Sequence, residues 1–188
     1  MRGLSLNFVR TVAVVLTTAT ALALCLVSPS FAQRDPLDLA QAGFLAKDRG
    51  EFNLAVRLFD EALQCGFFAD KQRGLLLYSR GASFEALGSR DRALSDFDAA
   101  IALLPDFPNV YVYRGIIWGD KPEYQRALQD FLTASKLKPS DPLVFNNIGN
   151  VYQKIGQDDR ALDNYDRAIG LTIMAPILDD SPTKGLFA

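Results

Sequence analysis

The 188-residue chain contains no histidine and only two cysteines, Cys25 and Cys65. Histidine is the commonest general base and metal ligand of proteins, so its absence removes much of the usual chemistry of enzymes and metal sites. No glycine-rich phosphate loop is present, and the acid pairs Asp158-Asp159 and Asp179-Asp180 fall at expected turn or tail positions. We therefore predict a binding protein that is not an enzyme, with no catalytic residue, metal or cofactor.

The N-terminal segment 1–32 has the pattern of a secretory signal. Arg2 and Arg10 form a positively charged start, the run from Thr11 to Val27 is uncharged, and a stretch of small residues ends at Ala32. We expect cleavage after Ala32. The remaining chain would then be exported, in a bacterium to the periplasm.

Two alternatives to cleavage stay open. The first is an uncleaved membrane anchor, although the run from Thr11 to Val27 is only marginally long enough for a bilayer core about 30 Å thick. The second is lipidation at Cys25. With an uncleaved anchor, Arg2 and Arg10 would stay in the cytoplasm and the rest of the chain would again lie outside it, facing the periplasm. Contact with a membrane is expected only through this N-terminal segment.

The charge and cysteine content of the exported chain limit its partners. Removing residues 1–32 takes away two of 20 basic residues and none of the 22 acidic ones, so the net charge becomes 18 minus 22, or −4. Because nucleic-acid binding depends on neutralising phosphates, no nucleic-acid partner is expected. Cys65 would be the single remaining cysteine, which we interpret as a buried thiol, with an intermolecular disulfide as the alternative.

A fourfold internal repeat occupies the rest of the chain. Each copy has a glycine, an alanine twelve residues later, an aromatic residue four further on, and a second alanine three beyond that. The glycines are Gly43, Gly81, Gly115 and Gly149; the first alanines are Ala55, Ala93, Ala127 and Ala161; the aromatics are Phe59, Phe97, Phe131 and Tyr165; the second alanines are Ala62, Ala100, Ala134 and Ala168. The last two spacings between copies are equal, and the first is longer by four residues, which lie around Ala69 to Arg73.

This pattern resembles the tetratricopeptide repeat, a helix-turn-helix unit of about 34 residues. The resemblance implies an all-α protein, a right-handed α-solenoid of four repeats and eight helices. The expected domains are a signal peptide at 1–32, a repeat domain at 33–175 with repeats at about 36–69, 74–107, 108–141 and 142–175, and a C-terminal tail at 176–188. The expected helices span 36–49, 52–66, 72–87, 90–103, 108–119, 121–137, 142–155 and 158–171.

The turn inside each repeat carries a glycine in three copies, Gly50, Gly88 and Gly156, and Pro122 in the third repeat. In that third copy an Asp stands three residues before a Glu, in the segment Asp120-Lys121-Pro122-Glu123. This spacing predicts a capping-box-like start for the helix that follows, which would replace the glycine turn.

A correlated arginine and aspartate distinguish the two middle repeats from the outer two. Arg80 and Arg114 precede the repeat glycine, and the same two copies carry Asp96 and Asp130 just before the repeat aromatic. The outer repeats lack both residues. Because a partly buried arginine needs a carboxylate, we predict Arg–Asp pairs that bridge the two helices of a repeat and have a structural role.

The first helix of each repeat lines a concave groove in proteins that resemble this family, and a peptide or a partner helix is commonly held there. The corresponding positions are Ala40, Phe44, Lys47 and Asp48; Leu75, Tyr78, Ala82 and Glu85; Asn109, Val112, Ile116 and Asp120; and Asn146, Asn150, Gln153 and Lys154. The Lys, Asn and Arg with which one subgroup grips a C-terminal carboxylate are mostly replaced by apolar residues, so that mode of binding is not expected.

The groove is predicted to be graded along its length. Its floor would be apolar over three repeats, and side-chain amides at its far end could bond the backbone of an extended peptide. The apolar residues are Phe44, Leu75, Tyr78, Val112 and Ile116, and the amides are Asn146, Asn147 and Asn150. The alternative for any one of these residues is that it packs between helices.

The end of the last repeat suggests a second hypothesis. Residues 176–188 contain two prolines and a glycine and are not expected to form a capping helix. An apolar face made of Leu162, Tyr165, Ile169 and Ile173 would then be covered by the tail or by a second copy. The two functional hypotheses are an adaptor or assembly factor of the bacterial cell envelope that binds a protein or peptide in its groove, and a self-associating scaffold that dimerises through repeat 4. A membrane-anchored or lipoprotein component of an envelope complex is a further alternative.

Overall fold

The computed structural model describes residues 35–179, with the side chains of Cys65 and of residues 175–179 left out. The predicted signal at 1–32, the interpretation of the Cys65 side chain and the last residues of the tail therefore lie outside the described part. Residues 35–179 form eight helices and no strand. They are α2 (Pro36–Asp48), α3 (Phe52–Cys65), α4 (Asp70–Ala86), α5 (Arg90–Leu103), α6 (Pro108–Asp120), α7 (Tyr124–Leu137), α8 (Pro142–Lys154) and α9 (Asp158–Asp179).

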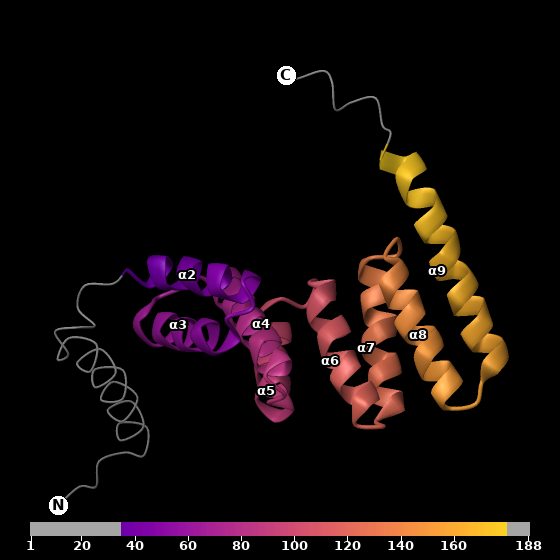
Figure 1. Ribbon diagram of the computed structural model, residues 1–188, viewed down its shortest axis with the longest axis horizontal. Helices are drawn as coiled ribbons and strands as arrows, with labels where there is room; N and C mark the ends of the chain where they lie inside the picture. The colour runs from indigo at the N-terminus through magenta and orange to yellow at the C-terminus, as the bar shows by residue number, and fades with distance from the viewer. Residues whose placement is uncertain (1–34, 180–188) are drawn as a thin grey trace, which may run out of the picture.

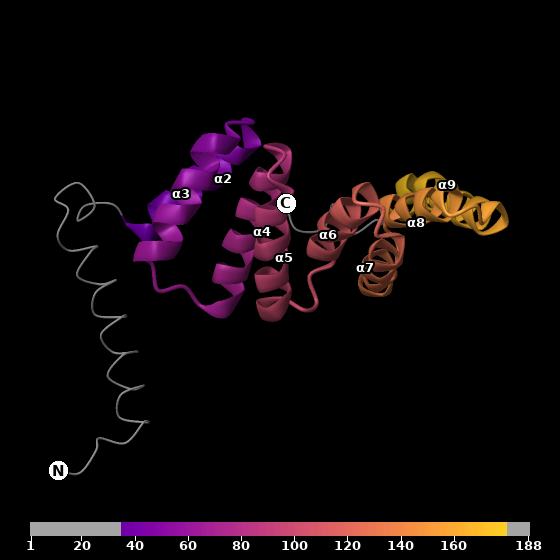
Figure 2. The same cartoon turned by 90° about the horizontal axis from the view of Figure 1, so that it is seen from below.

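The helices pack as four successive hairpins that stack in a row from α2 to α9 (Figures 1 and 2). Within the row, the first helices of neighbouring hairpins also approach each other, α2 beside α4 and α6 beside α8. We call the side formed by α2, α4, α6 and α8 the groove face. None of the described helices is both long enough and apolar enough to span a lipid bilayer.

The repeat glycines occupy equivalent settings in all four hairpins. A Cβ atom added to Gly43 would lie 2.7 Å from Cε1 of Phe59, and the same contact would measure 2.8, 2.8 and 2.5 Å for Gly81, Gly115 and Gly149 with their own aromatic rings. A side chain there would overlap the ring, so glycine lets the two helices of a hairpin approach closely. The predicted register of the four repeats is confirmed.

The four extra residues between repeats 1 and 2 form an additional helical turn. Helix α4 has 17 residues, whereas α6 and α8 each have 13. At its start, the side-chain carbonyl of Gln72 accepts a hydrogen bond from the backbone N–H of Ala69 at 3.2 Å. The insertion thus lengthens α4 toward its N-terminus without disturbing the spacing of the repeats that follow.

The predicted capping box in repeat 3 is wrong. Asp120 is the last residue of α6 and accepts a hydrogen bond from Arg90 at 2.7 Å, while α7 begins only at Tyr124. Pro122 takes the left-handed turn position, with φ of 28°, where the other turns have glycine at 73–76°. The turn is closed by the same backbone hydrogen bond as in the other hairpins, here from the N–H of Glu123 to the carbonyl oxygen of Trp118 at 2.8 Å.

The expected end of the last helix is also wrong. Helix α9 continues through Pro176 to Asp179, eight residues beyond the predicted end at 171. A proline inside a helix removes one backbone hydrogen bond and crowds the preceding turn, which bends or weakens a helix without always ending it. The last turns of α9 project beyond α8 (Figure 1). Three of the four residues of the expected apolar face, Leu162, Ile169 and Ile173, are 56–63% exposed. The inclusion of Tyr165 in that face was wrong, because its ring packs against Gly149 inside the hairpin.

Candidate partner-binding groove

Each of the two middle hairpins is tied to the hairpin before it by one arginine on its first helix. In repeat 2, Arg80 Nε and Nη2 donate to the two carboxylate oxygens of Asp96 at 2.8 and 2.5 Å, and Nη1 donates to Asp60 of the preceding hairpin at 2.6 Å. Repeat 3 has the same arrangement, in which Arg114 donates to Asp130 at 2.9 and 2.6 Å and to Asp98 at 2.6 Å. We call each set an arginine triad.

The predicted pairing of Arg80 with Asp96, and of Arg114 with Asp130, is confirmed. Asp96 and Asp130 are buried, and a two-pronged guanidinium contact satisfies both of their oxygens. Hydrogen bonding to Asp130 raises the pKa of Arg114 above its ordinary value despite the opposing effect of burial, and Asp96 does the same for Arg80. These arginines stay charged, and their contacts have a structural role.

The third partner of each triad was not predicted. Asp60 and Asp98 directly follow the repeat aromatic of the hairpin that precedes the arginine. The signal was present in the sequence, because these aspartates occur in the copies that come just before Arg80 and Arg114. The hairpin before repeat 4 has Leu132 at this position, and repeat 4 itself has Ile148 and Asn164 in place of arginine and aspartate.

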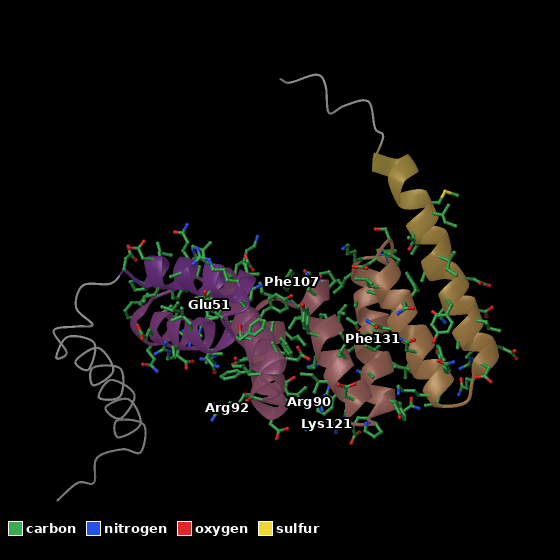
Figure 3. All side chains as sticks on the ribbon, viewed as in Figure 1. Glu51, Arg90, Arg92, Phe107, Lys121 and Phe131 are labelled. Carbon is green, nitrogen blue, oxygen red and sulfur yellow. The ribbon has the colours of Figure 1, made fainter. Side chains whose placement is uncertain are left out.

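The junction between repeats 2 and 3 is further closed by aromatic rings and ion pairs (Figure 3). Phe107 lies at one end, where its ring packs edge-on to Tyr78, and Arg90 and Lys121 lie at the other. Lys121 pairs with Asp91 at 2.6 Å, alongside the contact between Arg90 and Asp120. The groove face between α4 and α6 is therefore filled by side chains of this chain.

Tyr78 is the centre of this aromatic cluster. Its ring centroid lies 5.0 Å from that of Phe107 and 5.6 Å from that of Tyr113. Burial, followed by the nearby phenol of Tyr113, raises the pKa of Tyr78 above its ordinary value, while a hydrogen bond with Asn109 has the opposite effect. Tyr78 thus packs between hairpins, as the alternative interpretation of the groove residues allowed.

An apolar pocket of about 230 Å³ opens between α2 and α4. Phe44, Leu75 and Phe68 are three of its large side chains, and two glutamines also line it. The full lining is Leu37, Ala40, Gln41, Phe44, Phe68, Gln72, Leu75 and Leu76. The pocket lies where a buried cluster of repeat 1 ends and a second cluster, running through repeats 2–4, begins.

A smaller pocket of about 130 Å³ lies between α6 and α8 and is more polar. Asn147, Asn150 and Lys154 line it from α8, and Ile116 and Asp120 line it from α6. Gly115, Gly119, Phe131 and Val151 complete the lining. The side-chain oxygen of Asn150 also accepts a hydrogen bond from the hydroxyl of Tyr165 at 2.8 Å, which holds its amide in place.

The seven predicted groove residues therefore separate into four groups. Phe44 and Leu75 line the apolar pocket, and Ile116 and Asn150 line the polar one. Tyr78 and Val112 pack against the core, and Asn146 is exposed outside both pockets. Sequence reasoning missed Phe68 and Gln72, which the insertion brings to the rim of the apolar pocket; the length difference between repeats was the signal for them.

The stacked hairpins define an α-solenoid, and family comparisons assign its repeats. A model of the family described as "TPR repeat" matches residues 120–156, and one described as "Tetratricopeptide repeat" matches residues 144–172. The two matches overlap and together run from the turn of repeat 3 into α9, over residues 120–172. All four hairpins have the same glycine–aromatic contact, so the chain is built of tetratricopeptide repeats.

Solved structures show the same fold. The crystal structure of MamA matches with a TM-score of 0.71 at 17% identity, over 84% of this chain and 87% of that one. MamA (41-end) from Desulfovibrio magneticus RS-1 matches with a TM-score of 0.68 at 19% identity, over 76% and 78%. YrrB, a TPR protein with an unusual peptide-binding site, matches with a TM-score of 0.66 at 22% identity, over 88% and 83%. At these identities the likeness shows a shared fold.

Proposed function

We propose that this protein is an adaptor or assembly factor that binds a peptide segment or a helix of a partner along its groove face. One large apolar side chain of the partner sits in the pocket between α2 and α4, and its backbone is held by Asn147 and Asn150 between α6 and α8. The observation that carries the proposal is the pair of pockets on the same face, one almost wholly apolar and one that also carries polar side chains.

Three further points support this function. An apolar pocket with a few polar groups at its rim is the usual form of a recognition site, and buried anchors of this kind commonly dominate the energy of an interface. Side-chain amides can bond a peptide backbone whatever its sequence. YrrB shares the fold and has a peptide-binding site, which supports peptide binding as the kind of function to test.

The test begins with a selection of short peptides from a random library on the chain from residue 33 onward, followed by measurement of their dissociation constants. The selected peptides should share one large apolar residue. Leu75→Asp should weaken their binding at least tenfold, because it places a charge in the apolar pocket. Asn147→Ala should weaken the binding of every selected peptide by about the same factor, because the lost contact is to the peptide backbone. This factor should be smaller than that for Leu75→Asp.

Leu132→Asp is the matched control, because Leu132 is exposed on α7, outside both pockets. It should leave the dissociation constants unchanged, and circular dichroism should show equal helicity in all variants. A substitution of Tyr78 is not suitable, because that ring is part of the packed junction. If Leu75→Asp and Leu132→Asp behave alike, the groove face does not bind these peptides and the proposal is wrong.

We propose that the protein works outside the cytoplasm, in the bacterial cell envelope. The support is the sequence of residues 1–32, with its two arginines, its uncharged run and its small-residue ending. N-terminal sequencing of the protein from an envelope fraction should give Gln33. A protein that keeps Met1 in the membrane fraction would instead be anchored, and one that keeps Met1 in the cytoplasm would contradict the proposal. That the chain is not an enzyme stays a prediction.

A further inference from the structure

The internal junctions show how one hairpin of this protein receives the next. In repeats 2 and 3 the following hairpin packs on α5 and α7, and Leu94 and Leu128 are each only 8% exposed. In repeats 1 and 2 the aspartate that follows the repeat aromatic accepts a hydrogen bond from an arginine on the first helix of the next hairpin. Asp60 accepts from Arg80, and Asp98 accepts from Arg114. Two residues on the second helix of a hairpin thus contact the hairpin that follows: a buried leucine, and an aspartate paired with an arginine. We call these two residues the receiving elements.

Helix α9 carries both receiving elements with nothing on them in the described part of the chain. Leu162 is equivalent to Leu94 and Leu128 by the repeat spacing but is 60% exposed. Asp166 is equivalent to Asp60 and Asp98 and is exposed. Ile169 and Ile173 continue the row, because positions four, seven and eleven residues after Leu162 fall on one side of a helix. We call Asp159, Leu162, Asp166, Ile169 and Ile173 the end face.

The end face is apolar with negative charge only. The two arginines of α9 are turned toward α8, where Arg167 stands 4.0 Å from the ring centroid of Phe145 and Arg160 stands 5.6 Å from that of Tyr152. The exposed charges among the isoleucines and leucine are therefore Asp159 and Asp166. A surface of this kind is complementary to a helix that carries a cation between apolar residues.

The same charges argue against a second copy of this chain as the occupant. Two end faces laid together would oppose their own aspartates, and like charges on facing helices are unfavourable. Stacking of repeat 1 of another copy on α9 would supply no cation either, because Ala42 stands where repeats 2 and 3 have Arg80 and Arg114. The residues that would fit are buried inside the folded chain.

We propose that the end face is a second binding site, separate from the groove face, for an amphipathic helix of a partner protein with an arginine set among apolar residues. The partner helix takes the place of the first helix of a fifth repeat. Its arginine pairs with Asp166, and its apolar residues cover Leu162, Ile169 and Ile173. The two internal contacts from Arg80 and Arg114 to the preceding hairpin are the template for this pairing.

A fluorescein-labelled peptide of residues 70–86 serves as the probe, because it is a first helix that carries Arg80. Its binding to the chain from residue 33 onward is measured by fluorescence anisotropy. Leu162→Asp should abolish binding, and Asp166→Ala should weaken it about three- to fivefold, as expected for a partly exposed ion pair. Asp166→Arg should weaken it more than Asp166→Ala, and a peptide with Arg80→Asp should restore binding to that variant.

Asp163→Arg is the matched control, since Asp163 is exposed on α9 outside the end face, and it should change the affinity less than twofold. Leu75→Asp on the groove face should also have no effect, which keeps this result independent of the proposed function. Absence of binding by the unaltered peptide, or equal loss with Asp163→Arg and Asp166→Arg, would overturn the proposal. So would a dimer of the chain that Leu162→Asp converts to a monomer, or binding that appears only after removal of residues 180–188.

Discussion

The junction between repeats 3 and 4 closes without the charges that close the two junctions before it. Asp60, Arg80 and Asp96 form the triad between repeats 1 and 2. At the junction between repeats 3 and 4, the equivalent positions hold Leu132, Ile148 and Asn164. Ile148 is buried as thoroughly as any core residue of the chain. The glycine–aromatic contact is the same in all hairpins. The comparison teaches that the glycine contact, which sets the packing inside each hairpin, is the constant feature, and that charged or apolar residues can occupy the same positions between hairpins.

The largest expected effect comes from breaking a triad at its centre. Arg114→Ala leaves Asp130 buried without its partner, and removal of one member of a buried pair typically costs about 3 kcal/mol or more of unfolding free energy. Urea unfolding followed by circular dichroism measures it. Arg57→Ala, at an exposed arginine of α3, should change stability by less than about 0.5 kcal/mol. Equal effects at the two sites would mean that the triad contributes nothing.

The glycine contact should be equally sensitive at a charged and at an apolar junction. Gly115→Leu and Gly149→Leu each push a side chain into an aromatic ring, and overpacking of this kind costs about 1–3 kcal/mol. The two losses, from the same urea titrations, should agree within about 1 kcal/mol. A loss at Gly115 alone would show that the charged junction depends on close approach and the apolar one does not.

The regular parts of this fold could be predicted because they repeat. Four aligned copies fixed the register of Gly43 and its equivalents, and six of the eight helices have both ends within two residues of the prediction. The pairing of Arg80 with Asp96 could be inferred because both residues are absent from the outer repeats. Comparison among copies supplied the information that a single repeat does not contain.

The features that could not be predicted are departures from the repeat. Local capping rules favoured a helix start before Pro122, but the chain there forms the same hydrogen-bonded turn as the hairpins that have glycine. Local rules likewise predicted that α9 ends before Pro176, whereas the helix continues to Asp179. Asp60 and Phe68 act across a boundary between hairpins, so their contacts depend on how the hairpins pack. Within the groove, the sequence could not separate Leu75, which lines a pocket, from Tyr78, which packs in a junction.

Replacing all the residues of a charged junction with those of the apolar junction should change the unfolding free energy only slightly. The variant Asp98→Leu, Arg114→Ile and Asp130→Asn gives the junction between repeats 2 and 3 the residues of the junction that follows it. Because all three charges and their burial cost are removed together, its unfolding free energy should stay within about 1 kcal/mol of the wild type. Arg114→Ile alone should lose as much as Arg114→Ala. If the triple variant loses that much too, the two chemistries are not interchangeable.

The smallest expected effect concerns the phenol of Tyr78, in the junction between repeats 2 and 3. Because the pKa of Tyr78 is raised in the folded chain, the neutral form of its phenol stabilises the fold. This contribution to the unfolding free energy is complete below the ordinary tyrosine pKa of about 10. It is lost as the pH rises from there through the pKa of Tyr78 in the folded chain. The stability of the wild type should therefore fall relative to that of Tyr78→Phe as the pH rises above about 10. Urea midpoints at each pH measure the difference, with Tyr124→Phe as the control outside the aromatic cluster. A constant difference across this range would show that the phenol ionises as freely in the junction as in water.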